Sequence, residues 1–222
     1  MTARVIRLAI ASAVAFGVGF ATLALPRAAR AQDARLAAIA DADARAAVGA
    51  VIVDAERQGL PREPLVTKAL EGVEKGATGP RIEAAVRAMA TRLAAARVAL
   101  APAATPVELL AGADALSAGV PAAAIHEVRA ASPGRSTAVA LGVLAQLSAR
   151  GVPAGRAAAK VTDLVRRGAN QAQMLALQRA IQDDLAVGVP PADALELRTR
   201  AIIAALPPPA PPAPVASLTA KP

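Results

Sequence analysis

The sequence contains no cysteine, tryptophan or tyrosine. Without cysteine, the chain can form no disulfide and offers neither a thiol nucleophile nor a thiolate metal ligand. Its two phenylalanines, Phe16 and Phe20, both lie close to the N-terminus. The rest of the chain therefore lacks the rings that stack on nucleic-acid bases, form cation–π cages or anchor most protein interfaces.

The chain has a single histidine, His126, which cannot by itself build a histidine-based metal centre. His126 follows Ile125 on a predicted helix, about 100° further around it, so we expect it at the edge of the apolar face or on the surface. No serine lies in a Gly-x-Ser-x-Gly elbow, and neither a dinucleotide-binding glycine turn nor a P-loop occurs. The sequence thus predicts a non-catalytic protein.

The acidic residues form no convincing site either. Asp41 and Asp43 resemble half of a calcium loop, but its glycine and distal glutamate are missing. Asp183 and Asp184 are neighbours on a predicted helix, so their side chains point about 100° apart. We therefore expect no catalytic residue, no metal ligand and no cofactor.

The N-terminal segment has the pattern of a secretory signal. Residues 1–7 hold two arginines and no acid, and Leu8–Leu25 is an uncharged apolar run of 18 residues. Small residues follow at Ala29 and Ala31, the two positions that signal peptidase reads, so we expect cleavage before Gln32. An uncleaved membrane anchor is the alternative, because 18 residues just suffice to span a bilayer.

Residues 1–31 are accordingly predicted to be a signal peptide, and the protein to be periplasmic or secreted without stable membrane insertion after cleavage. Ten residues of the apolar run are Ala, Gly, Ser or Thr, which insert weakly and favour cleavage. Residues 1–31 contain no Arg-Arg pair, which favours the general secretory route over the twin-arginine route. Abundant Ala, Arg, Leu and Val are typical of a GC-rich bacterial genome.

The net charge of +8 falls once the predicted signal is removed, because its four arginines leave 21 basic against 17 acidic residues. This mild excess favours solubility and weak attraction to anionic surfaces. It does not form the basic patch expected of a nucleic-acid-binding protein. We therefore expect no nucleic-acid partner.

Apolar residues recur at helical spacing along residues 32–206, and no stretch alternates with the period of a strand. Two helix starts carry capping-box sequences, Thr105 to Glu108 and, more weakly, Asn170 to Gln173. The pattern predicts about nine helices, at 41–58, 62–75, 80–100, 106–118, 121–131, 135–150, 153–167, 170–187 and 191–205.

A Gly-x-Pro tripeptide recurs between these helices. The glycine suits the left-handed position just past a helix end, and the proline suits the first turn of the next helix. Residues 59–77 and 151–169 also align, with six identities in 19 positions. A unit of 30–37 residues fits stacked helical hairpins, with the first spacing of 60 covering nearly two units. The predicted corner residues are Gly59, Pro61, Gly119, Pro121, Gly151, Pro153, Gly188 and Pro190.

The sequence thus predicts an all-α domain over residues 32–206, either a short α-solenoid or a compact helical bundle of pseudo-repeats. Six prolines among residues 207–214 favour extended polyproline II, so 207–222 is predicted to be a disordered tail.

Because reactive groups are scarce, the expected role is that of an envelope scaffold or interaction module with an unidentified protein partner; the oligomeric state stays open. One alternative is an enzyme or ligand carrier whose site gathers Asp, Glu, Arg and Lys in a helical cleft. Another is weak association with the cell wall or a membrane surface.

Overall fold

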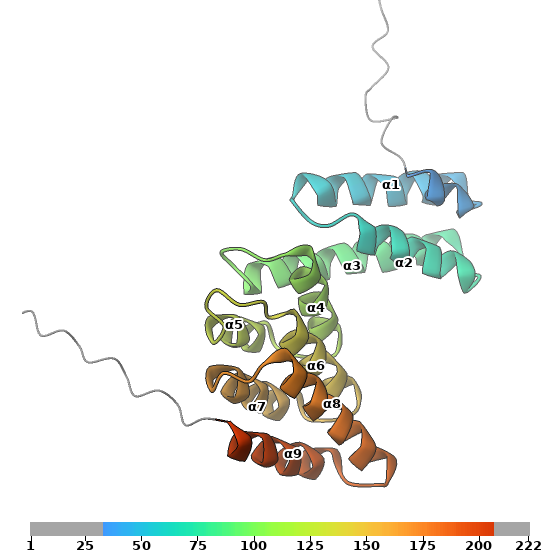
Figure 1. Ribbon diagram of the computed structural model, residues 1–222. Helices are drawn as coiled ribbons and strands as arrows, with labels where there is room; N and C mark the ends of the chain where they lie inside the picture. Colours follow the sequence, from blue (N-terminus) through green and yellow to red (C-terminus); the bar gives the residue numbers. More distant parts are fainter. Residues whose placement is uncertain (1–32, 207–222) are drawn as a thin grey trace, which may run out of the picture. The chain divides into compact units, whose positions relative to one another are not determined.

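The computed structural model describes residues 33–206. Within them the chain is all-helical, with nine α-helices, one short 3-10 helix and no strand (Figure 1). The predicted signal peptide and proline-rich tail lie outside the described residues. The helices are η2 (Ala34–Ala38), α1 (Ala42–Arg57), α2 (Glu63–Glu74), α3 (Gly79–Ala99), α4 (Pro106–Ser117), α5 (Ala122–Ala130), α6 (Ala138–Ala149), α7 (Ala154–Arg166), α8 (Gln171–Ala186) and α9 (Pro191–Ala205).

The prediction of nine α-helices is confirmed, with one clear difference in their bounds. Helix α6 begins at Ala138, three residues later than the sequence pattern suggested. Gly134 has a φ of +68°, and the Arg135 amide donates to the Ser132 carbonyl, so the turn after Pro133 continues. The amide of Thr137 then donates to the side chain of Glu108, a tertiary contact that helical periodicity could not reveal.

The helices form two rows. The first row contains α1, α3, α4, α6 and α8, each packed on the next. In the second row α5 packs on α7 and α7 on α9, while α2 packs on α3 and η2. Figure 1 shows α5, α7 and α9 one after another, with α4, α6 and α8 beside them. This is the stacked arrangement that the recurring corners predicted.

Each Gly-x-Pro corner leads the chain from the first row to the second. Its glycine has a positive φ, +88° at both Gly151 and Gly188. The next amide donates to the carbonyl five residues earlier, as from Val152 to Leu147 at 3.0 Å. This is the Schellman arrangement, which satisfies the last carbonyls of the helix. The apolar residue after the glycine is buried at Leu60, Val120 and Val152 and partly buried at Val189. Gly59 and Gly119 have positive φ as well.

The spacing of 60 residues between the first two corners contains three helices, not the four of two full units. After α2, the chain places both α3 and α4 in the first row, and only then enters the second row at α5. No extensive contact joins α2 to α5 within residues 33–206. The second row is therefore interrupted between them.

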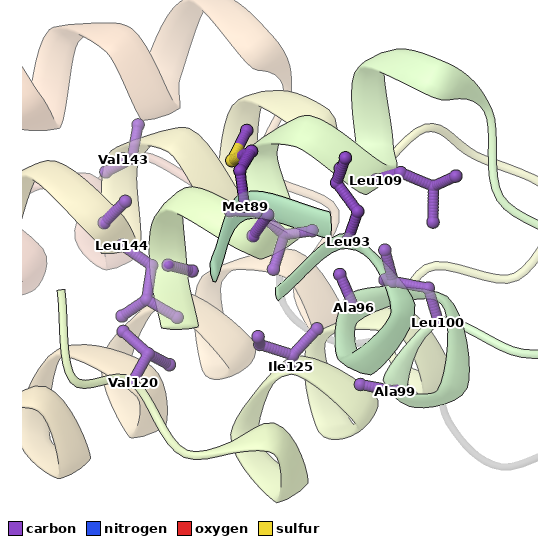
Figure 2. Packing of buried hydrophobic residues seen from close by; sticks show 14 of the residues in the cluster. Met89, Leu93, Ala96, Ala99, Leu100, Leu109, Val120, Ile125, Val143 and Leu144 are labelled. Carbon is purple, nitrogen blue, oxygen red and sulfur yellow. The ribbon is translucent and has the colours of Figure 1, made fainter. Parts of the chain in front are cut away.

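Helix α3 connects the parts on either side of this interruption. At 21 residues it is the longest helix described, and it packs on α1, α2, α4 and α5. Figure 2 shows Leu93 and Ala96 of α3 in one apolar cluster with Leu109 of α4 and Ile125 of α5. A Cβ atom at Gly112 would lie 3.1 Å from that of Ala96, so this glycine lets α3 and α4 approach closely.

Candidate functional site

A groove of about 700 Å³ lies between α2 and α4 and is floored by α3. It lies beside α2, the helix after which the second row is interrupted, and no residue of α5 lines it. Its lining combines apolar, hydroxyl and charged side chains from these three helices and from the corner at Pro61. We call it the α2–α4 groove.

Part of the wall that α4 contributes is apolar and open to solvent. Val107 and Leu110, 65% and 36% exposed, lie three residues apart and share one helix face. They are two of the six large apolar side chains exposed among the described residues. Met89 of α3 lies buried beneath them in the lining. The groove thus offers apolar surface that the described part of the fold does not cover.

The charged side chains of α2 in this groove are already paired. Lys68 donates to Glu71 at 2.9 Å, and Lys75 also bonds to Glu71. Glu63 accepts from Arg35 of η2 at 2.7 Å. Hydrogen bonds from Lys75 and Lys68 lower the pKa of Glu71 to about 2, so its carboxylate is held in the ionised form.

Two side chains in the groove are not paired in this way. The Nε atom of Arg92, on α3, is buried and has no acceptor among the described residues. Asp114, on α4, interacts electrostatically with Arg92 and Lys68 but forms no hydrogen bond within residues 33–206. Partial desolvation raises the pKa of Asp114, against the lowering effect of the two cations. One buried donor thus lacks a partner among the described residues, and an acceptor that is exposed to solvent lies in the same groove.

A second polar cluster, which we call the Glu108 junction, joins the ends of α4, α5 and α6. Glu108 is 3% exposed, and its Oε1 accepts from the Thr137 amide at 2.9 Å, the Thr137 hydroxyl at 3.1 Å and Arg129 at 3.3 Å. Its Oε2 accepts from the amide and hydroxyl of Thr105. Burial alone would raise the pKa of Glu108, but these hydrogen bonds lower it to about 2.

The capping boxes predicted at both helix starts are present. Thr105 and Glu108 bond reciprocally at the start of α4, and Asn170 and Gln173 do so at the start of α8. At α4 the sequence therefore identified the local role of Glu108. It missed the remote partners Thr137 and Arg129, because these come from later helices.

His126 is exposed on α5 and does not line the α2–α4 groove. Asp41 caps α1 by accepting from the amides of Asp43 and Ala44. Asp184 forms a two-bond ion pair with Arg198 of α9. Among residues 33–206, no group of three His, Cys, Asp or Glu side chains is placed to hold a metal ion.

Sequence reasoning did not identify Arg92 or Asp114. The only sequence signal near them was the irregular spacing of 60 residues between the first two corners, which spans both positions. That spacing was interpreted as nearly two repeat units, and it could not place a donor on α3 beside an acceptor on α4.

The geometry defines a class: an all-α protein of two helical rows, with an open groove at an interruption of one row. Searches of known protein families, of curated proteins and of solved structures find no match to this chain. None of the helices described in residues 33–206 combines the length and apolar character needed to cross a bilayer.

Proposed function

We propose that this protein is a non-catalytic interaction module that binds a segment of a partner protein in the α2–α4 groove. The observation that carries the proposal is the exposed apolar pair Val107 and Leu110 on α4. The same groove holds Asp114 of α4 and Arg92 of α3, neither of which forms a hydrogen bond within the described residues. Exposed apolar surface combined with unsatisfied polar groups is stabilised when a complementary surface covers both.

The side chains in the groove favour binding over catalysis. Ser117 is a hydroxyl in the lining, but it donates to the Ala113 carbonyl of its own helix at 3.0 Å. A serine nucleophile needs a base within hydrogen-bond reach, and His126 lies outside the lining. The groove is therefore better suited to hold a ligand than to activate one.

A carrier of a small ligand is the second candidate, and the size and charge of the groove favour it. A volume of about 700 Å³ falls in the range of small-molecule pockets. Such pockets, however, usually enclose most of their ligand, whereas Val107 here remains 65% exposed. The open wall supports a longer segment that continues beyond the groove.

The proposed site of action is the bacterial envelope, since residues 1–31 carry the pattern of an export signal. We expect the exported protein to begin at Gln32. Intact-mass measurement of the native protein tests this, and a mass that includes residues 1–31 would contradict it.

Photocrosslinking from within the groove tests the interaction. A photoreactive residue replaces Val107 in the full chain, and a control chain carries it at Val187, an exposed apolar residue after α8. We expect a discrete crosslinked product from position 107 that Leu110→Glu removes. Equal products from both positions, or a product that Leu110→Glu leaves unchanged, would contradict the proposal.

A further inference from the structure

The α2–α4 groove also shows what kind of segment it suits, an inference that rests on the proposed function. We infer that the groove recognises the main chain of an extended segment, with the terminal guanidinium nitrogens of Arg92 donating to a carbonyl and Asp114 accepting from an amide N–H. Apolar side chains of the same segment would lie on Val107 and Leu110.

The pairing state of the charged side chains carries this inference. Glu63 is bound by Arg35, and Glu71 by Lys68 and Lys75, so their charges are already compensated. Arg92 and Asp114 remain as one donor and one acceptor of opposite charge. A ligand carboxylate at Arg92 would face Asp114, and a ligand cation at Asp114 would face Arg92. A neutral group that both donates and accepts avoids either repulsion.

The peptide group is the most common neutral group of this kind, with one N–H and one C=O per residue. In an extended chain these groups are free to bond sideways, while successive side chains point to opposite faces. Such a segment could place apolar side chains on Leu110 and present its backbone to Arg92 and Asp114.

Other protein segments satisfy the groove less well. A helical segment bonds its own amides and carbonyls internally, so it would leave Arg92 and Asp114 unpaired. The proline-rich stretch 207–214 of this chain has few amide hydrogens to donate to Asp114. Recognition of polyproline also relies on aromatic grooves, and the described lining contains no aromatic side chain.

Selection of peptides on the full chain, followed by backbone modification, tests the inference. Linear random peptides displayed on phage are selected against the wild-type protein and counter-selected against Leu110→Glu. Each amide of a selected peptide is then N-methylated in turn, and its affinity is measured by fluorescence anisotropy. We expect one N-methylation to weaken binding about tenfold, the scale of one lost charge-assisted hydrogen bond.

Matched variants assign this effect to the two side chains. In the Asp114→Ala variant, N-methylation of the sensitive amide should no longer weaken binding. Asp183 is an exposed carboxylate on α8, so the Asp183→Ala variant should behave as wild type. Arg92→Met should weaken every selected peptide, and Arg87→Met, which removes an arginine bonded to Glu83 of the same helix, should not. Circular dichroism of each variant checks that the helices are intact.

The possible failures are distinct. If peptides depend on Leu110 but show no sensitive amide, or the same sensitivity in Asp114→Ala, main-chain recognition is overturned and groove binding stands. Selected peptides that bind as helices or through a charged side chain would also overturn main-chain recognition and leave groove binding standing. If no peptide depends on Leu110, both the inference and the proposed function are overturned.

Discussion

The Glu108 junction and the α2–α4 groove both place an arginine near a carboxylate, but only the junction completes the pairing. Glu108 accepts five hydrogen bonds from three residues, and its pKa is lowered to about 2. Asp114 accepts none within the described residues, and its pKa is raised. The same chemistry thus stabilises the fold at the junction and remains available for a partner in the groove.

The packing of the helices explains this difference. At the junction three helix ends meet, so amides, hydroxyls and a guanidinium all reach Glu108. In the groove the lining comes from α2, α3, α4 and the corner before α2, and none of these elements supplies a hydrogen-bond partner to Arg92 Nε or to Asp114.

Glu108→Gln should lower the free energy of unfolding by about 3 kcal/mol, because it removes one partner of a buried ionic network and leaves donors unsatisfied. Urea denaturation followed by circular dichroism measures the change. Glu127→Gln, an exposed position on α5, is the control and should leave the midpoint unchanged. Equal urea midpoints for the two variants would show that the hydrogen bonds of Glu108 do not stabilise the fold.

Acid should act on the same network. The folded pKa of Glu108, about 2, lies below its ordinary value of 4.5, so its stabilisation is complete above the unfolded pKa and is lost as the pH falls through the folded pKa. The loss amounts to about 3 kcal/mol over that window. Urea midpoints of wild type and Glu108→Gln should therefore converge between pH 4.5 and pH 2. A difference between the two urea midpoints that stays constant over this pH range would contradict the lowered pKa of Glu108.

Gly151→Val should cost about 1–2 kcal/mol, because a β-branched residue is strained at the positive φ of a helix corner. Gly188→Val should behave alike. Gly155, an exposed residue inside α7 with open space around its Cβ position, is the control. Gly155→Ala should instead stabilise by up to about 1 kcal/mol. Thermal melts of the variants measure both signs, and unchanged melting in both valine variants would count against the corner geometry.

Asp114→Asn should change stability by less than about 1 kcal/mol at neutral pH. Because the folded pKa of Asp114 is raised, the folded state binds its proton more readily, and this residue adds stability only as the pH falls through that pKa. Replacing it with a neutral amide should be neutral or slightly stabilising. A loss as large as that of Glu108→Gln, measured in the same urea titration, would show that Asp114 has a structural partner.

His126→Ala should have the smallest effect, below about 1 kcal/mol, because the side chain is exposed on α5. We also expect the variant to complement a deletion strain. A variant that folds normally by circular dichroism and yet fails to complement would favour an enzymatic role over the interaction module.

Local patterns predicted most of this fold. Every α-helix bound except the start of α6 lies within one residue of its prediction, because caps, prolines and corner glycines mark the ends of the other helices. The start of α6 differs because Glu108 holds the Thr137 amide. The groove was not predicted, since the meeting of Arg92 and Asp114 depends on how α3 packs on α4. Helical periodicity reports which face is buried, but not against which helix.

The interruption of the second row also has a consequence for cooperativity. In stacked repeats, stability is transmitted mainly between neighbouring units. Here η2, α1 and α2 are connected to α4–α9 chiefly by their packing on the single helix α3. A segment seated in the groove would touch both α2 and α4 and so supply the missing neighbour. Its binding energy would then add a second connection between the two parts that α3 joins, and so favour their unfolding as one unit.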